Sequence, residues 1–432
     1  MTSEIAIMNK EAVALATDSA VTINEGKKIY NSANKLFSLS KYNPIGIMIY
    51  GNATFMSIPY ETIVKVFRSE LNGECCKKVD DYAQKFINFL NDNKLKISNE
   101  EQNNYIDIVI GSLLTQIKQK IEEEWENEIQ KNGKIDLDKS KKIVSIIITN
   151  FADTFSNQEL ECFSKESIDS IKKTIDKMFK KLLEKIFQDL PLQAEDKKKL
   201  SEIINKAIIC DNFPSWHSGI VIAGFGEDEI FPAIASFRIE SLIDGKLKYK
   251  KEKMENISTK NNAAIIPFAQ SEMVSTFIEG VDPNYQKFKR SYLENIFKNY
   301  PEIIIKNSKK LNKLEKKNKD LIHSEFNKWS KQIYEDYKKE MTNFTRDNHV
   351  NQVLSVVGIL PKDELAAMAE SLVNLTSFKR RVTMAQETVG GPIDVAVISK
   401  GDGFIWISRK HYFKPELNHQ FFDNYFRTEG KK

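Results

Sequence analysis

Residues 2–22 read Thr2-Ser-Glu-Ile-Ala-Ile-Met-Asn-Lys-Glu-Ala-Val-Ala-Leu-Ala-Thr-Asp18-Ser-Ala-Val-Thr22. Two short apolar runs, 4–8 and 12–16, are separated here by the polar tripeptide Asn9-Lys10-Glu11. This pattern predicts two strands joined by a tight turn. If the strands pair as a hairpin, the second returns to the start of the first. The sequence therefore predicts that Asp18 lies near Thr2.

Thr2 becomes the first residue of the chain if Met1 is removed, and small second residues generally permit that removal. A free N-terminal threonine carries a hydroxyl nucleophile and an α-amine, whose ordinary pKa is about 7.7–8.0. At neutral pH this amine can exchange protons with the hydroxyl beside it, so one residue supplies both nucleophile and base. Many cytosolic chains begin Met-Thr, and the argument therefore depends on the residues that follow.

Two further strands are predicted at 34–39 and 44–50, before a helical stretch at 56–70. Lys35 is the second residue of the first of them and is expected at a sheet edge. Gly51 ends the second. A glycine at a strand-to-helix turn lets the backbone approach a substrate and leaves an amide able to donate a hydrogen bond.

Each of these residues also has a plainer interpretation. Asp18, within Thr-Asp-Ser, is typical of a turn. Lys35 is typical of a solvated surface lysine, and Gly51 of a strand end. Only their joint order and spacing favours a functional site.

The order of these features resembles the N-terminal-nucleophile hydrolase superfamily, and within it the proteasome β-subunit branch. The matching pattern is threonine, strand, turn, strand, Asp-Ser, Lys-Leu-Phe and an apolar strand that ends in glycine. The resemblance implies an α+β fold, namely the four-layer α/β/β/α sandwich of that superfamily with extra helical insertions. It implies that Thr2 is the nucleophile and Lys35 the cation that lowers its proton affinity. Asp18 then holds the lysine, and the Gly51 amide is the oxyanion donor, a role worth about 2.7–4 kcal/mol.

The far end of the chain follows the same order of elements. A strand pair is expected at 219–225 and 230–240, and a helix with an acidic first turn is expected after Pro361. A strand led by Gly390-Gly391 and an Asp402-Gly403 turn come after that helix. This order of helix, double glycine and hairpin is also the family's.

Two segments depart from the family pattern. The family places an aspartate and a serine just before the double glycine, where this chain has Gln386-Glu387-Thr388-Val389. The turn Phe268-Ala269-Gln270-Ser271 replaces a glycine-serine repeat before the third helix. The resemblance therefore assigns supporting roles to Ser19, Ser271 and Glu387, and the altered segments bear on rate and substrate more than on fold.

The length of the chain predicts additions to a single core. A proteasome-like subunit has about 200 residues, a normal domain size, and this chain has 432. A discontinuous core is expected from 1–70, 213–280 and 360–415, with helical insertions at 71–212 and 281–359 and a tail at 416–432. Long amphipathic patterns at 103–131, 165–189 and 301–345 predict helical hairpins or a small bundle. These insertions could cap the site, form subunit contacts or dock a partner.

Composition limits the partners. The net charge of +4 is too small to indicate a polyanion partner, and the lysine-rich run 306–317 is typical of a solvated helix face. No apolar stretch reaches the ~20 residues that span a bilayer, and no signal peptide precedes the first strand. Reduced thiols in the cytosol best fit the four cysteines, Cys75, Cys76, Cys162 and Cys210. A cytoplasmic protein with no nucleic-acid or membrane partner is expected.

Other chemistries lack their motifs in the sequence. No metal-binding spacing joins the five histidines, His217, His323, His349, His411 and His419. The chain has no Gly-x-Ser-x-Gly elbow and no phosphate loop. No metal and no cofactor are therefore expected.

The leading hypothesis is a proteasome-like threonine hydrolase that cleaves peptide or other amide bonds through Thr2. The resemblance also implies a homo-oligomer with a peptide or protein substrate. Two alternatives stay open: a small-molecule amidase, and a catalytically silent proteasome-like module that serves assembly or partner binding.

Overall fold

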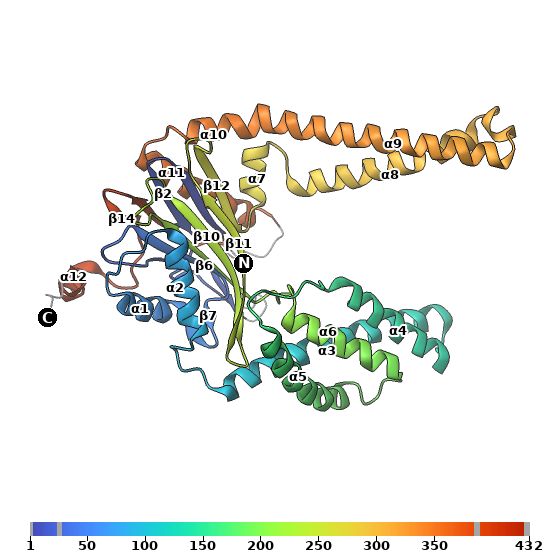
Figure 1. Ribbon diagram of the computed structural model, residues 1–432, viewed down its shortest axis with the longest axis horizontal. Coiled ribbons are helices and arrows are strands. Elements are labelled where there is room, and N and C mark those ends of the chain that lie inside the picture. The colour runs from blue at the N-terminus through green and yellow to red at the C-terminus, as the bar shows by residue number, and fades with distance from the viewer. Residues whose placement is uncertain (1–2, 24–27, 384–388, 427–432) are drawn as a thin grey trace. The chain divides into compact units, whose positions relative to one another are not determined.

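The computed structural model describes residues 3–23, 28–383 and 389–426. The chain forms two compact units. The first unit comprises Met1–Ala33, Ile257–Val397 and Ile405–Lys432, and the second comprises Asn34–Asn256 and Ile398–Phe404 (Figure 1). Both contain helices and a five-stranded sheet with antiparallel pairs, which confirms the predicted α+β class. The four-layer sandwich stays a prediction.

The sheet of the first unit is built around the predicted N-terminal hairpin. Its strand order is β12-β1-β2-β13-β14. The strands are β1 (Ser3–Asn9), β2 (Ala12–Thr17), β12 (Ala263–Ala269), β13 (Asp394–Ser399) and β14 (Gly403–Ser408). Strands β1 and β2 pair antiparallel, with Glu4 opposite Thr17. The Asn9 side chain closes the turn by accepting from the N–H groups of Glu11 (2.9 Å) and Ala12 (3.2 Å), so this part of the prediction is confirmed.

Three helices supply most of the apolar partners of this sheet. They are α7 (Glu272–Glu279), α10 (Asn351–Val357) and α11 (Lys362–Arg381). Ile5 and Ile7 of β1 form one core with Leu365 and Val373 of α11. Pro361 precedes α11 and acidic residues occupy its first turn, as the sequence predicts.

A long two-helix hairpin follows α7. It consists of α8 (Pro283–Asn307), the short 3-10 helix η1 (Leu311–Lys313) and α9 (Lys316–Thr345), and it ends in the π-helical turn η2 (Arg346–Val350). The Asp282 carboxylate caps α8 by accepting from the N–H groups of Asn284 (2.9 Å) and Tyr285 (3.1 Å). The amphipathic stretch predicted at 301–345 is helical except at 308–315, where the chain leaves α8 at Ser308 and reverses before Lys316, so the predicted helical hairpin is present and the stretch is not one helix.

Small elements complete the first unit. They are β3 (Val21–Ile23), β4 (Lys28–Tyr30), the 3-10 helix η3 (Pro415–Leu417) and α12 (His419–Phe426). Strands β3 and β4 pair with each other as a separate two-stranded sheet.

The sheet of the second unit has the strand order β11-β10-β9-β6-β5. Its strands are β5 (Leu36–Ser38), β6 (Ile45–Gly51), β9 (Ser218–Gly224), β10 (Ala233–Ile243) and β11 (Lys246–Asn256). The short pair β7 (Thr54–Phe55) and β8 (Ile58–Pro59) leads into α1 (Tyr60–Leu71) and α2 (Val79–Asn91). Phe67 and Phe86 of these helices pack edge to face, 5.1 Å between ring centroids, in the core that contains Ile47 and Ile222.

Four more helices form a second apolar core in this unit. They are α3 (Asn99–Asn132), α4 (Leu137–Thr154), α5 (Lys165–Ile186) and α6 (Ala194–Ile209). Ile110, Ile148 and Ile204 are fully buried among them. The amphipathic patterns predicted at 103–131 and 165–189 are therefore confirmed as helices.

The predicted division into one discontinuous core and two helical insertions stays a prediction. The two units divide the chain along other lines, and α2, within the predicted insertion 71–212, packs with the strands of its own unit. Over the described ranges, no helix is both long and apolar enough to cross a membrane.

Candidate functional site

Two of the predicted site residues, Thr2 and Glu387, lie outside the described residues. The first described residue is Ser3, which begins β1 and follows Thr2 directly. Contacts of Ser3 are therefore the structural features that bear most directly on Thr2.

Asp18 holds the backbone at the start of β1. Its side chain is fully buried. Oδ1 accepts from the Ser3 N–H (3.0 Å), and Oδ2 accepts from the N–H groups of Ala20 and Gly390 (both 3.1 Å). The Asp18 N–H in turn donates to the Ser3 carbonyl (3.1 Å). One carboxylate thus joins the start of β1, the end of the predicted hairpin and the predicted double glycine, 372 residues away.

Ser19 makes the second set of contacts with the double glycine. Its N–H donates to the Gly390 carbonyl (3.0 Å), and its hydroxyl donates to the Pro392 carbonyl. Gly391 has φ +78°, and a Cβ there would lie 2.8 Å from the Asn31 Cβ. Only glycine fits this turn without strain or displacement of its neighbour. The supporting position predicted for Ser19 therefore lies beside the residues that Asp18 binds.

The other neighbour of Ser3 is the end of β12. Ala269 pairs with Ser3 and adopts φ +61°, which is uncommon for a residue with a side chain. Gln270 follows and accepts from the Arg380 side chain (2.8 Å). Ser271 then precedes α7, where its carbonyl accepts from the Ser275 N–H (2.8 Å). In the first unit, Asp18 and the Ala269–Ser271 turn therefore flank Ser3 from the two neighbouring strands.

Glu4 is a buried carboxylate that sequence reasoning missed. It is 1% exposed and lies on β1 two residues after Thr2. Because side chains alternate along a strand, Glu4 points to the sheet face opposite that of Ser3 and Ile5. In the sequence, the signal that could have identified Glu4 is the presence of a charged residue within an otherwise apolar run.

Lys35 and Gly51 belong to the second unit, and the structure brings their backbones close. Lys35 is 5% exposed, so the plain interpretation of a solvated lysine is wrong. Its carbonyl accepts from the Ile49 N–H (2.9 Å), two residues before Gly51 on β6. In the first unit, the Ala33 N–H donates to the Ser19 carbonyl (3.1 Å), and Ala33 precedes Lys35 by two residues in the sequence.

Gly51 occupies a position that excludes larger residues. Its φ is +80°, and a Cβ there would lie 2.3 Å from the His217 carbonyl oxygen. That carbonyl also accepts from the Asn52 N–H (3.2 Å). Burial lowers the pKa of His217, partly offset by its contact with the Pro214 carbonyl. Gly51 is thus fixed by backbone contacts at the start of β9.

A separate buried polar cluster, also missed from the sequence, joins the strands of the second unit to its helices. Lys248 Nζ lies 2.7 Å from Glu240 Oε2, and their side chains are 0% and 1% exposed. Lys248 also donates to the Ala207 carbonyl (2.7 Å) at the end of α6. The Tyr105 hydroxyl of α3 donates to Glu240 (3.1 Å) and accepts from the Trp216 indole (3.2 Å). Burial raises the pKa of Glu240, and Lys248 opposes that rise.

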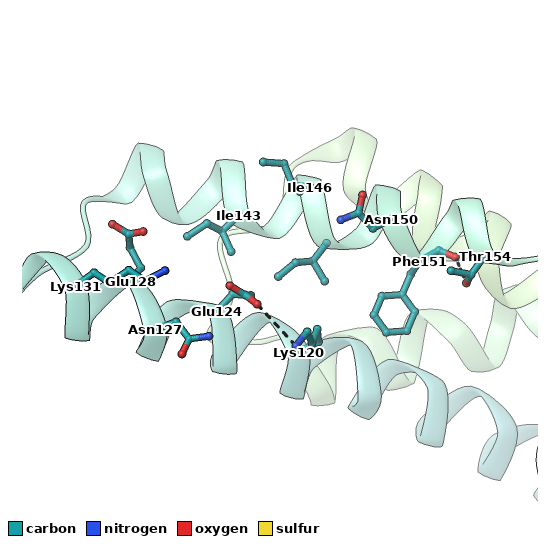
Figure 2. A pocket seen from close by; sticks show the side chains of 11 residues that line it. Lys120, Glu124, Asn127, Glu128, Lys131, Ile143, Ile146, Asn150, Phe151 and Thr154 are labelled. Carbon is teal, nitrogen blue, oxygen red and sulfur yellow. Dashed lines mark hydrogen bonds and ion pairs between the residues drawn. The ribbon is translucent and has the colours of Figure 1, made fainter. Parts of the chain in front are cut away.

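A cavity of about 600 Å³ opens between α3 and α4. Figure 2 shows Ile143 and Phe151 between the two helices, with an ion pair between Lys120 and Glu124 (3.7 Å) at the rim. None of the residues predicted for the site lines this cavity. Over the described part of the chain, no group of three His, Cys, Asp or Glu residues is placed to bind a metal ion.

Comparisons with known proteins leave the family open. No family model matches the chain, and no curated protein matches it. Three solved structures that align with it are Anbu chains, each 9% identical. "Helical Assembly of the Anbu Complex from Pseudomonas aeruginosa" has a TM-score of 0.27 and covers 98% of this chain and 93% of its own.

Two further Anbu structures align over similar lengths. The "Anbu (ancestral beta-subunit)" of Yersinia bercovieri has a TM-score of 0.27 and covers 100% of this chain and 99% of its own. The "Anbu (Gly-1) mutant" of Hyphomicrobium sp. strain MC1 has a TM-score of 0.29 and covers all of both chains. TM-scores this low carry no argument about fold or activity.

Proposed function

We propose that this chain is an N-terminal threonine hydrolase that cleaves peptide or other amide bonds through Thr2, after removal of Met1. The observation that supports the proposal best is the buried Asp18 carboxylate, which accepts from the Ser3 N–H (3.0 Å). Ser3 is bound to Thr2 through one peptide bond. Fixing its N–H limits where Thr2 can lie, and a fixed nucleophile is a requirement of covalent catalysis.

In the proposed mechanism, Thr2 Oγ attacks the substrate carbonyl carbon while its proton passes to the free α-amine. The positive charge of Lys35 favours the ionised form of the hydroxyl. The Gly51 N–H donates to the oxyanion of the tetrahedral intermediate, an interaction worth about 2.7–4 kcal/mol. The leaving amine takes the proton and an acyl-enzyme remains. Water then attacks that ester while one of its protons passes to the α-amine and from there to Thr2 Oγ, which releases the carboxylic acid and restores the hydroxyl.

The second unit supplies two features that agree with these roles. Lys35 is buried, so its charge is less screened by solvent than that of a surface lysine. Gly51 is held by its fit against the His217 carbonyl, and backbone donors stabilise an oxyanion best when they are fixed in advance.

The proposal is tested by the intact mass of the full chain, produced with no tag before Met1, with and without a β-lactone probe. We expect loss of Met1 and a single probe adduct that peptide mapping assigns to Thr2. Thr2→Ala is the matched control, because alanine is also small enough for Met1 removal but has no hydroxyl. It should lose Met1 and gain no adduct.

Three other outcomes would contradict the proposal. Retention of Met1 blocks the amine and would favour a silent assembly module. An equal adduct on Thr2→Ala would place the reactive nucleophile elsewhere. Removal of Met1 with no adduct from a β-lactone or an epoxyketone would contradict cleavage of peptide bonds and leave a small-molecule amidase with a narrower pocket.

A further inference from the structure

The α8–α9 hairpin exposes apolar side chains in an ordered series on each helix. On α8 the series is Tyr285, Phe288, Tyr292, Ile296, Tyr300 and Ile303; on α9 it is Phe326, Trp329, Ile333, Tyr337, Met341 and Phe344, with the half-buried Ile322 one helical step before them. Ten of the twelve are 39–68% exposed, and Phe326 and Tyr337 are half-buried. Such a series at helical spacing is the face that an amphipathic helix normally buries.

The hairpin itself buries little of this surface. In α8 and α9, which the structure describes throughout, the buried residues are Pro301, Ser330 and Tyr334. Figure 1 shows the two helices running side by side. Their mutual contacts therefore leave both series uncovered.

Both series lie on one side of the hairpin. Near η2, a cavity of about 550 Å³ is lined by members of both, namely Tyr285 from α8 and Tyr337, Met341 and Phe344 from α9. The two series meet at this end of the hairpin, and because each is a single stripe along its helix, we treat the twelve residues as one apolar face, hereafter the hairpin face.

The spacing within each series is symmetric. Along α8 the steps are three, four, four, four and three residues, centred on position 294. The six α9 residues 326–344 have the same steps, centred on position 335, and Ile322 extends beyond their end. Reversing either helix about its centre places each apolar residue over another apolar residue. Tyr292, for example, falls opposite Ile296, and Phe288 falls opposite Tyr300.

The two centres lie at the same level of the hairpin. The Phe297 carbonyl accepts from the Ser330 hydroxyl, and the Phe297 ring lies 5.6 Å from the Tyr334 ring. Phe297 is three residues past the centre of its series and lies beside 330–334. Because the helices are antiparallel, position 294 is then level with about position 335. A single two-fold axis that crosses both helices at this level can therefore relate each series to its own reverse.

We propose that the hairpin face binds the same face of a second copy of this chain, with the two hairpins antiparallel about a two-fold axis near 294 and 335. Each α8 would lie on the α8 of the second copy and each α9 on its α9, which completes a four-helix bundle. A second copy would meet each series with its own reverse, on both helices and at a common level. This symmetry is the reason to prefer a second copy as the occupant.

The exposed area is large enough for a stable dimer. A large apolar side chain has roughly 200 Å² of surface, and ten such side chains are about half exposed. Each copy therefore offers about 1,000 Å², and two copies would bury about 2,000 Å², at the upper end of standard interfaces of roughly 1,200–2,000 Å². Monomers seldom expose continuous apolar patches above roughly 600 Å².

Sedimentation of the full chain across 1–50 µM tests the pairing. We expect the wild type to contain an even number of chains. The double variant Tyr292→Glu/Ile333→Glu should have half the wild-type mass, with pairing weakened at least about 100-fold. Ile230→Glu is the matched control, because Ile230 is 79% exposed and lies in the second unit, and it should keep the wild-type mass. Circular dichroism should be the same for all three proteins.

Disulfide cross-linking tests the antiparallel register. In a background in which serine replaces Cys75 and Cys162, chains carrying Tyr292→Cys are mixed with chains carrying Ile296→Cys. The mixture should form a covalent pair faster than either variant alone. A wild type that is monomeric at every concentration would overturn the proposal. So would an unchanged mass for the double glutamate variant, or equal cross-linking of the single variants and the mixture.

Discussion

Replacing Asp18 by alanine tests both the structure and the proposed function. The change removes the acceptor of three buried N–H groups, those of Ser3, Ala20 and Gly390. A buried donor without a partner costs about 1–3 kcal/mol, and hydrogen bonds to charged groups lie in the upper part of the range. Because water can enter the space that the carboxylate leaves and bind some of these groups, we expect a loss of about 3–6 kcal/mol.

Asp18→Asn separates the contributions of the two carboxylate oxygens. If the asparagine side chain turns its oxygen toward Ala20 and Gly390, it keeps both hydrogen bonds to their N–H groups. Its NH2 group then faces the Ser3 N–H, and two donors cannot bind each other. We therefore expect a smaller loss, about 1–3 kcal/mol, concentrated at Ser3. In Asp18→Asn, the rate of Thr2 labelling by the β-lactone should fall by a larger factor than the folding equilibrium constant, because Ser3, the residue after the nucleophile, loses its hydrogen-bond acceptor.

The assay is hydrogen exchange followed by mass spectrometry, which reports the free energy of local opening for each peptide. A local measure is needed because two compact units need not unfold together. Exchange in the peptide that spans 3–20 should accelerate at least about 100-fold in Asp18→Ala. Asp228→Ala, at an exposed position of the second unit, is the control and should change nothing in that peptide. A change below about 1 kcal/mol in Asp18→Ala would refute the reasoning.

Three further predictions concern the second unit. Lys248→Met should destabilise it by about 3–5 kcal/mol in urea unfolding, because the buried Glu240 loses its cationic partner. Adding Glu240→Gln should restore most of the loss, and no restoration would contradict this account. The pKa of His217 is lowered in the folded state. Its contribution to stability is therefore complete above its unfolded pKa of about 6.5 and is lost as pH falls below that value. His217→Gln should flatten this part of the curve of stability against pH, and an unchanged curve would count against the prediction. Gly51→Ala should lower the melting temperature through strain of at least about 2 kcal/mol. The added Cβ would lie 2.3 Å from the His217 carbonyl oxygen. An unaltered melting temperature would show that β6 can shift to make room.

Local patterns predicted the first hairpin well. The apolar runs at 4–8 and 12–16 and the turn at Asn9 specify β1 and β2 without help from the rest of the chain. The strands at 44–50 and 219–225 were predictable for the same reason, because each is a short apolar run that ends at a glycine or a turn.

Contacts between distant residues were beyond local patterns. Asp18 and Gly390 could each be singled out from the sequence, but no periodicity shows that a carboxylate will accept from an N–H group 372 residues away. Burial of Lys35 was also not predictable, because lysine is a surface residue in most settings. Glu240 and Lys248 lie on neighbouring strands whose other charged residues are exposed in part, and nothing in the sequence distinguishes the buried pair.

The helical hairpin shows how a pattern can be correct and still incomplete. Lysine and glutamate between the apolar positions of 281–359 predict helices with charged faces, and the structure has helices there. That reading treats the apolar positions as a face buried within the chain. The structure shows the opposite for Phe288 and Trp329, which are 68% and 56% exposed.

A helix that keeps an apolar series exposed is under no local constraint to space it symmetrically, because solvent contacts each position independently. A two-fold axis near 294 and 335 imposes such spacing, because each series must then match itself in reverse. The reversal at 308–315 brings the two centres to one level, as the contacts of Phe297 with Ser330 and Tyr334 establish. Lengthening that turn would leave both series intact, whereas inserting one residue within α9 before Trp329 would rotate Phe326 about 100° away from the face. Pairing should therefore tolerate the first change and be weakened by the second.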